Sequence, residues 1–403
     1  MAESGKREIG RRTFLKVAGA AGFAIVAPRA VRGAEANSKI ELGLMGCGGR
    51  GRWIANLFAA SGHFQVVAVH DYFQDRADGA GTDHKVDAKR RYTGLGGYKA
   101  LLADKCDAVA SISPPYFRPE QAAAAVDAGK HVYLAKPIAV DVPGCHAIAA
   151  AGKKATETKR VLLIDFQTRS DPFYMEALKR VHAGALGTLA FGESTYHCDR
   201  IGKQGDDKTP EGRLRNWVFD KALSCDIITE QNIHTLDVMN WIMQGPPVRV
   251  SGRGGRKSRV DVGDCWDHFA LTYEYPDGVA IAFSSRQFDG FGSKPDGIRN
   301  RMFGVDGVLE TSYGGQVLIR GKNFYRGGSS PGIYQDGAVV NINTFAESIR
   351  AGEFGNPTVA PSVQSDLITI MGRTAAYSGK VVTWDETVKS AEKLDGRLDG
   401  LKA

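Results

Sequence analysis

The feature that most constrains the fold is a glycine-rich segment between a short apolar run and an amphipathic one. Residues 40–45 (IELGLM) predict a buried strand, and GCGGRG follows at 46–51. The next apolar side chains recur at helical spacing. Gly46 suits a tight turn, Gly48 lets the main chain approach a phosphate, and Gly51 lets the helix pack on the strand. The helix N-terminus adds unpaired N–H groups and partial positive charge, so this unit predicts a dinucleotide site.

An acidic residue ends the next predicted strand. That strand covers residues 64–70 (FQVVAVH), and Asp71 follows it, 20 positions after Gly51. A carboxylate there can accept hydrogen bonds from an adenosine ribose and would repel a 2′-phosphate, so NAD is favoured over NADP. Arg76 lies close enough in sequence to keep NADP open. The expected cofactor contacts are Gly46, Cys47, Gly48, Gly49, Arg50, Gly51, Asp71, Ser113, Pro114, Lys136 and Gln167.

Strand and helix patterns continue to alternate up to about residue 160. Residues 108–112 and 131–134 predict two more strands, and polar groups follow them: Ser113 after the first and Lys136 after the second. In doubly wound sheets, ligands bind beyond the carboxyl ends of the strands. We therefore expect an α/β fold in which these side chains meet at one edge of a parallel sheet.

The second half of the chain predicts a largely antiparallel, open-faced sheet in an α+β domain. Residues 269–275 and 279–283 alternate apolar and polar side chains around a Pro-Asp-Gly turn, which is typical of a hairpin. We expect the tail after Glu386 to be loosely held. We expect four parts. Residues 1–36 form a signal peptide, and residues 37–160 form a Rossmann NAD-binding domain. Residues 161–342 form an α/β substrate and oligomerisation domain, and residues 343–403 form C-terminal helices that pack on both domains, with a charged tail.

The first 36 residues predict an export signal. Arg11 and Arg12 precede an apolar run at 17–27, which is too short to span a bilayer. A small-x-small pattern at 34–36 predicts a cleavage site. The segment resembles a twin-arginine signal, which implies that the twin-arginine machinery exports the folded chain to the periplasm or beyond. The alternative is a basic extension without a targeting role.

Charge and apolar content limit the partners of the remaining chain. The whole chain carries a formal charge of +7, and residues 1–36 hold seven basic and three acidic side chains, which leaves +3. So small an excess does not favour a nucleic-acid partner. No other segment has 18 consecutive apolar residues, so we expect no stable membrane insertion after signal cleavage. The six cysteines contain no CxxC pair, which argues against a zinc motif or a disulfide scaffold.

The chain resembles the Gfo/Idh/MocA oxidoreductases, which act mostly on sugars and cyclic polyols. The resemblance rests on the glycine-rich unit, DAGKHVYLAKP at 127–137, CDIITEQNIHTLDVMNW at 225–241 and VVTWDE at 381–386. It implies a small carbohydrate substrate and a homo-oligomer that pairs through the open sheet face. It also implies that Lys136 and His234 act on the substrate hydroxyl beside the nicotinamide.

Two positions depart from the family pattern. Family members commonly have Glu-Lys-Pro where this chain has Ala135, so a carboxylate beside the lysine is missing. Related sequences often carry a histidine in the loop after the Ser/Thr-Pro turn, where this chain reads Tyr116-Phe117-Arg118. The first departure puts the positioning of cofactor and lysine in doubt, and the second implies different substrate contacts.

The expected catalytic residues are Lys136, His234 and Glu230. Oxidising a secondary alcohol removes a hydride from carbon and a proton from oxygen. A lysine becomes a base when burial and a neighbouring cation lower its pKa, and a histidine can pass the proton on. Glu230 and His234 are four positions apart, so one continuous helix would place both on the same face. The alternatives are an exposed lysine and a purely structural histidine.

Further candidate contacts lie in the second half. The expected substrate-binding residues are Lys136, Arg169, His197, Trp217, Glu230 and His234. An aromatic face such as that of Trp217 suits sugar C–H groups, and core packing is its alternative. His197 could instead pack within a strand, or join Cys198, Glu230 and His234 in a metal site. Nothing in the spacing fixes such a site, so we expect no metal.

The export signal bears on the expected reaction. An exported NAD enzyme would meet no nucleotide pool and would have to carry its cofactor. We expect an NAD-dependent oxidoreductase for a secondary hydroxyl of a sugar, glycoside or cyclic polyol, with its nucleotide tightly bound and recycled in place. One alternative is a glycoside hydrolase or lyase that oxidises its substrate transiently and returns the hydride. Another is a non-catalytic nucleotide or sugar binder, which Ala135 favours and the intact Lys136 and His234 oppose.

Overall fold

The computed structural model describes residues 39–294 and 296–403, and the expected export signal lies outside them. The first part is a parallel sheet in the order β3-β2-β1-β4-β5-β6. Its strands are β1 (Ile40–Met45), β2 (Phe64–His70), β3 (Arg91–Tyr92), β4 (Ala108–Ser111), β5 (His131–Ala135) and β6 (Leu162–Asp165). This order confirms the predicted Rossmann-like fold. The expected boundary after residue 160 falls just before the last strand.

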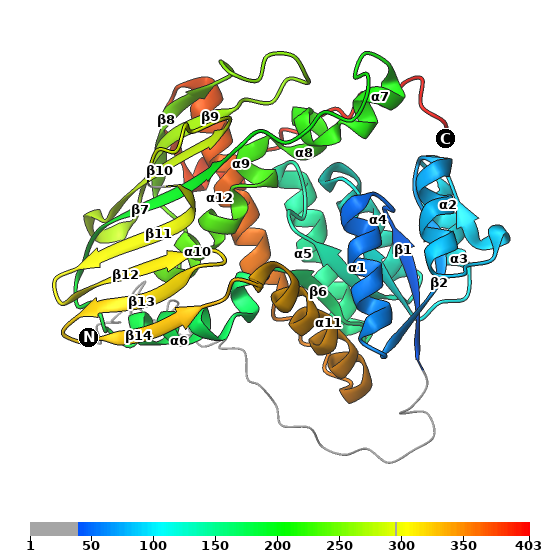
Figure 1. Cartoon of the computed structure of the whole chain (residues 1–403), viewed down its shortest axis with the longest axis horizontal. Helices are drawn as coiled ribbons and strands as arrows, with labels where there is room; N and C mark the ends of the chain where they lie inside the picture. Colours follow the sequence, from blue (N-terminus) through cyan, green and yellow to red (C-terminus); the bar gives the residue numbers. More distant parts are fainter. Residues whose placement is uncertain (1–38, 295) are drawn as a thin grey trace, which may run out of the picture.

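Helices cover both faces of this sheet (Figure 1). They are α1 (Gly49–Ala60), α2 (Gln74–Asp83), α3 (Gly97–Ala103), α4 (Arg118–Asp127) and α5 (Val142–Glu157). Strands buried on both faces have to be apolar throughout, and β4 and β5 are almost wholly buried. The polar residues of this part are therefore concentrated at the strand ends, where the site lies.

The second sheet is mixed and has nine strands, in the order β14-β13-β12-β11-β7-β10-β9-β8-β15. Only β7 and β10 pair in parallel. The bounds are β7 (Leu189–Cys198), β8 (Arg249–Gly255), β9 (His268–Glu274), β10 (Ala280–Gln287), β11 (Gly297–Gly304), β12 (Gly307–Ser312), β13 (Gln316–Gly321), β14 (Tyr325–Ser329) and β15 (Val382–Thr383). The largely antiparallel sheet expected for this half is confirmed.

One face of the second sheet packs on helices and the other is open. The covering helices are α6 (Pro172–His182), α10 (Ile233–Met243) and α12 (Val359–Ser378). On the open face, Phe191 stacks on Phe303 with ring centroids 4.5 Å apart, and Phe191 is 47% exposed. α12 also packs on α5, so it joins the two sheets (Figure 1).

Helix α11 (Ile333–Ala351) returns to the first domain and begins ten residues before the expected boundary at 343. Ala338, Ile342 and Phe345 pack with Phe58 and Tyr133 in the core beside the parallel sheet. This helix therefore shields one face of the Rossmann-like sheet close to the glycine-rich turn.

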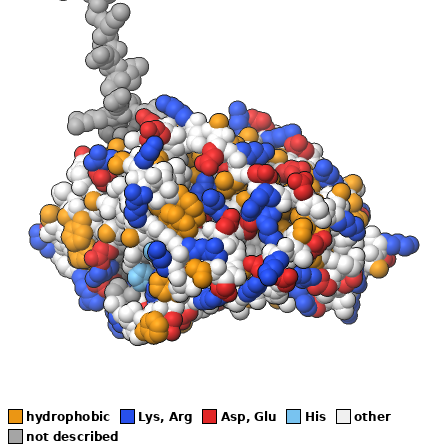
Figure 2. Space-filling model, turned by 90° about the horizontal axis from the view of Figure 1, so that it is seen from above, with side chains coloured by type: hydrophobic (Ala, Val, Ile, Leu, Met, Phe, Trp, Pro, Cys, Tyr) orange, Lys and Arg blue, Asp and Glu red, His pale blue; other side chains and the backbone are white. Residues whose placement is uncertain are grey.

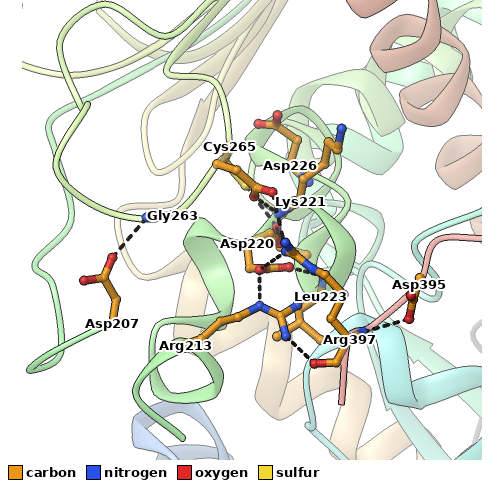
Figure 3. Close-up of polar contacts among 12 residues, drawn as sticks. Asp207, Arg213, Asp220, Lys221, Leu223, Asp226, Gly263, Cys265, Asp395 and Arg397 are labelled. Atoms are coloured by element: carbon orange, nitrogen blue, oxygen red, sulfur yellow. Dashed lines mark hydrogen bonds and ion pairs between the residues drawn. The ribbon is translucent and has the colours of Figure 1, made fainter. Parts of the chain in front are cut away.

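The C-terminal segment is docked, contrary to the loosely held tail that the sequence suggested. The Arg397 guanidinium donates to Asp220 at 2.7 Å, and its carbonyl accepts from Arg213, as Figure 3 shows. Leu398 and Leu401 pack against an apolar cluster that includes Phe73. The charged composition was misleading because Arg397 pairs with carboxylates, while Leu398 and Leu401 pack on apolar side chains. The segment holds α7 (Pro210–Arg215) and α8 (Lys221–Ser224) to the first domain.

The surface has no large region of one charge on the face that Figure 2 shows, where basic and acidic side chains are interspersed. Within residues 39–294 and 296–403, no helix combines the length and apolar character needed to cross a membrane. The same residues contain no cluster of three or more histidine, cysteine or acidic side chains suited to a metal ion.

Candidate functional site

The glycine-rich turn is built so tightly that two of its glycines cannot be replaced without strain. Gly46 has φ +91°, and a Cβ there would lie 2.6 Å from the Ser113 nitrogen. A Cβ on Gly51 would lie 1.8 Å from the Gly46 oxygen. A Cβ on Gly49 would meet nothing within 4 Å. The turn therefore leaves open space at the N-terminus of α1, which fits a pyrophosphate group.

Asp71, which follows β2, holds the glycine-rich turn through its carboxylate. Its carboxylate accepts from the Cys47 N–H at 2.7 Å and from the Phe73 N–H at 3.0 Å. Each oxygen keeps further acceptor capacity, because a carboxylate oxygen has two lone pairs. The buried acid thus holds the loop and places negative charge where an adenosine ribose would bind.

A cavity opens beside Asp71, and residues from both halves of the chain form its wall. Its lining includes Gly46, Asp71, Phe73, Ser113, Pro114 and Trp217. Trp217, a candidate for stacking on a sugar, thus lines the same cavity as Gly46 and Asp71. α7 and the segment after it bring Trp217 there, a placement that local sequence does not specify.

Lys136 follows β5 and reaches across to the helical segment that contains Glu230. Its Nζ donates to the main-chain oxygen of Glu230 at 2.6 Å and lies 3.7 Å from Oε1 of the same residue. Burial lowers the pKa of Lys136 to about 8; the charges of Arg50 and Arg118 lower it further, whereas Glu230 raises it. A substantial fraction of this lysine is therefore neutral at mildly alkaline pH.

The helix expected to carry Glu230 and His234 is broken between them. α9 (Ile227–Glu230) ends at Glu230, and α10 begins at Ile233. The Asn232 N–H donates to the Ile227 oxygen, five residues back, and the His234 N–H donates to Gln231. This shift releases the Glu230 carbonyl from the helical ladder, and Lys136 takes it. The apolar periodicity continues through the break, so the sequence pattern did not predict the break.

His234 is buried next to the lysine as a neutral imidazole. Burial, with the charges of Lys136 and Arg50, lowers its pKa well below the usual value. Its ring centroid lies 5.3 Å from that of Tyr313. The structure thus brings together Lys136, Glu230 and His234, as the sequence predicted, and adds Arg50.

Several polar atoms around this group are buried without a partner among the residues described. They are Arg50 Nε, Gln167 Oε1, His234 Nδ1 and Tyr313 Oη. Buried polar atoms are rarely left unpaired in proteins, so a cluster of them indicates a bound polar group. Together with the glycine cradle, these donors and acceptors fit a dinucleotide and a hydroxyl-rich ligand.

Two predicted contacts are not brought to this group. Arg169 forms a two-pronged ion pair with Asp237, with contacts of 2.8–3.1 Å, and stacks on Trp241. His197 lies on the open face of the second sheet, where its Nε2 is 3.0 Å from the Ser284 hydroxyl. The one-residue alternation along β7 turns His197 away from the helices that carry His234.

Sequence reasoning missed three residues of the site. Asp165 ends β6, and an acid after an apolar strand was a signal available in the sequence. Tyr313 gave no such signal, because it comes from a distant turn. Arg118 was noted only as part of a loop that departs from the family pattern. It is buried and donates to the main-chain oxygens of Ser113 and Pro137.

Family comparisons agree with this geometry. A model described as "Oxidoreductase family, NAD-binding Rossmann fold" matches residues 40–163, and the "GFO/IDH/MocA C-terminal domain" model matches residues 174–310. The chain belongs to the Gfo/Idh/MocA family. It is an NAD(P)-dependent oxidoreductase of that type, as the resemblance implied.

Relatives and solved structures extend the family match. The chain is 26% identical over 330 residues to inositol 2-dehydrogenase of Pseudomonas fluorescens, covering 79% of this chain and 89% of the relative. It is 31% identical over 245 residues to the Serratia proteamaculans enzyme of the same name, covering 60% and 66%. A levoglucosan dehydrogenase complex with NADH and levoglucosan superposes with a TM-score of 0.69 at 16% identity, covering 86% and 99%. An aldose-aldose oxidoreductase from Caulobacter crescentus has a TM-score of 0.68 at 20% identity, covering 86% and 100%. These two structural matches show the shared family fold.

Proposed function

We propose that this protein oxidises a secondary hydroxyl of a sugar, glycoside or cyclic polyol with NAD, and that the nucleotide stays bound between turnovers. The observation that carries the proposal is a buried lysine of lowered pKa beside a neutral histidine, next to a glycine cradle. The names of the relatives support the substrate class, since they act on inositol. The unpaired polar atoms around His234 suit a ligand rich in hydroxyl groups.

The residues divide the chemistry between them. When bound, the nicotinamide supplies the hydride acceptor. Neutral Lys136 takes the proton from the substrate hydroxyl at Nζ, where burial keeps water from competing. Neutral His234 orients the hydroxyl, and the proton taken from the substrate stays on Nζ as the ammonium. Glu230 holds the lysine through its main-chain oxygen, and its carboxylate stabilises the ammonium that forms.

The preference for NAD rests on Asp71. Two main-chain N–H groups fix its carboxylate, so its negative charge cannot move away from a 2′-phosphate. The nearby Arg76 guanidinium is occupied by Gln204 and stacks on Phe73. We therefore propose NAD as the resident nucleotide.

Retention of the nucleotide is supported by the contacts around its cavity. Tyr72 and Leu95 line the cavity, and both bind the main chain of Lys402 at 3.0 Å. The C-terminal segment therefore has to move before this wall can open. An exported enzyme with a retained nucleotide would have to restore that nucleotide in place at each turnover.

The first test identifies the nucleotide. The protein is purified without added cofactor and denatured, and the released nucleotide is identified by mass and counted per chain. About one NAD(H) per chain is expected, and a panel of sugars and cyclic polyols should then change its absorbance at the NADH band. Bound NADP(H) would contradict the role given to Asp71. A bound nucleotide that no substrate reduces or reoxidises would favour a binding protein.

The pH dependence of the reaction follows from Lys136. Because the base is the neutral amine and its pKa is about 8, kcat/KM for oxidation is expected to rise with pH and level off above about pH 8. Below the pKa it should fall about tenfold per pH unit. Initial rates between pH 6 and pH 10 check this. A rate that does not rise between pH 6 and pH 10 would instead point to His234 as the base, because burial lowers its pKa well below 6.5.

The C-terminal segment offers a test of retention. Leu398→Asp places a charge in the apolar cluster with Phe73, so nucleotide release is expected to accelerate at least about tenfold. This corresponds to a loss of about 1.4 kcal/mol from the free energy that holds the segment against the cavity wall. The release rate is measured by dilution into a nucleotide scavenger. Lys393→Asp is the matched control, because Lys393 is exposed in the same segment. Equal release from wild type and Leu398→Asp would show that the segment does not retain the nucleotide.

The open face of the second sheet supports the expected homo-oligomer. It exposes Phe191, which stacks on the half-buried Phe303. We propose that a second copy of the chain covers these rings.

A further inference from the structure

A buried carboxylate lies beside the site and has no part in the mechanism given above. Asp165 ends β6 and is wholly buried. Its partner in the parallel sheet is Ala135, the residue before Lys136. The strand that leads to the lysine thus ends without a carboxylate, and the neighbouring strand supplies one at the same level. Burying a carboxylate is costly unless partners compensate it, so the partners indicate its purpose.

Three donors from three segments converge on Asp165. Arg50 of α1 donates from Nη2 to Oδ2 at 2.6 Å. Gln167 donates to the same oxygen at 3.1 Å, and Asn341 of α11 donates to Oδ1 at 2.8 Å. The carboxylate therefore joins the glycine-rich turn to the end of β6 and to α11.

Arg50 connects this carboxylate to the reacting group. It is the fifth residue of the glycine-rich segment, and its other terminal nitrogen donates to the Tyr334 hydroxyl at 2.6 Å. Its Nε is buried without a partner among the described residues. Its charge also lowers the pKa of both Lys136 and His234. The guanidinium is thus a positive charge that Asp165 and Tyr334 hold in place and that acts on the lysine.

The charges near Lys136 are finely balanced. Arg50 and Arg118 are positive, whereas Glu230 and Asp165 are negative, and all four act on the lysine. Within the described part of the chain, the hydrogen-bond partners of Arg118 are the carbonyl oxygens of Ser113 and Pro137. Without Asp165, the lysine would be exposed to the uncompensated charge of Arg50, and a positively charged nucleotide ring held next to the lysine would bind less well.

Building on the proposed oxidoreductase function, we propose that Asp165 is a positioning residue, which holds Arg50 in place and balances its charge beside Lys136. The pocket can then accept the positively charged, oxidised form of the nucleotide. The carboxylate that β5 lacks at Ala135 is in this way supplied by β6.

The test replaces the charge and keeps the shape. In Asp165→Asn, the ratio of the affinities for NAD⁺ and NADH is expected to fall about tenfold, because only the oxidised ring is positive. In a redox titration of the bound nucleotide, a tenfold change in this ratio shifts the reduction potential by about 30 mV, because the couple transfers two electrons. The rise of kcat/KM with pH should also move to lower pH, since Asp165 raises the pKa of Lys136.

A second variant separates charge balance from structural support. Asp165→Asn combined with Arg50→Met removes both charges, so the pocket regains its original net charge. The affinity ratio is expected to return to within about twofold of wild type, which is the coupling that a double-mutant cycle measures. A ratio that falls further in the double variant would overturn the proposal.

The matched control is Asp237→Asn. Asp237 is equally buried and pairs with an arginine, Arg169, but neither charge is among the largest influences on the pKa of Lys136. This variant should lose stability and keep the affinity ratio. If Asp165→Asn also loses stability without changing the ratio, its carboxylate is only structural and the proposal fails. The titration needs no sugar, so a failure of the proposed substrate class would be seen separately.

Discussion

Replacing Lys136 by methionine is expected to lower kcat about a thousandfold while leaving the nucleotide bound. Methionine matches the length of the lysine stem and cannot take a proton, so the contribution of a general base is lost. The glycine cradle and Asp71 are untouched, so nucleotide content should stay near that of the wild type. Steady-state rates and the nucleotide released on denaturation check the two halves of this prediction.

The same variant should be more stable than the wild type below pH 8. The folded-state pKa of Lys136 is about 8 and the unfolded value about 10.4, so the fold disfavours the charged amine. The unfolded state binds more protons between these values, and wild-type stability therefore rises with pH across that window. Removing the amine is expected to add about 1–2 kcal/mol below pH 8, after the loss of the bond to Glu230 is counted.

The control for both effects is Lys130→Met. Lys130 precedes β5 at the opposite end of the strand and donates to two main-chain oxygens. It should keep full activity. If Lys136→Met retains more than about a tenth of wild-type activity, another group is the base, because the lost contribution would fall below the usual range for such catalysis.

Replacing Gly51 by alanine is expected to abolish nucleotide binding and to lower the free energy of unfolding by about 3 kcal/mol. The new methyl group would lie 1.8 Å from the Gly46 oxygen, which is main chain and cannot swing aside. The turn would have to separate from α1, and the phosphate cradle would be lost. Thermal unfolding and equilibrium dialysis with NAD measure the two effects.

Gly49→Ala is the matched control within the same six residues. Its methyl group meets nothing within 4 Å, and alanine favours the first turn of α1 over glycine. This variant should keep the stability of the wild type or slightly exceed it, whereas Gly51→Ala should lose about 3 kcal/mol. Equal thermal unfolding of the two variants would mean that the close packing of Gly51 on Gly46 does not support the turn.

Most of the fold could be predicted because its signals are local. The strand, turn and helix around Gly46 are contiguous in sequence, and each residue type has one physical reason to be there. The hairpin around residues 276–278 is likewise specified by alternation and a turn. The docked C-terminal segment could not be predicted in this way, because Arg397 finds its carboxylates 177 and 133 positions away.

The sequence predicts the position of site residues that directly follow strands. It does not predict the position of residues that depends on tertiary contacts. Lys136 and Asp71 follow predicted strands, so the topology brings them to one edge. Trp217 lies on a segment that packs across the domains. His197 points to the open face of the second sheet, because its position along β7 places its side chain on that face. The break after Glu230 is a main-chain hydrogen-bond shift that side-chain periodicity cannot reveal.

The docked C-terminal segment has a consequence for the order in which the protein is made. The glycine-rich turn and Asp71 leave the ribosome early, whereas Lys402, which binds Tyr72 and Leu95, follows more than 300 residues later. A Rossmann-like unit that folds during synthesis would therefore present an unsealed nucleotide cavity throughout translation. The contacts that fasten this cavity wall can form only after residues 394–402 have emerged.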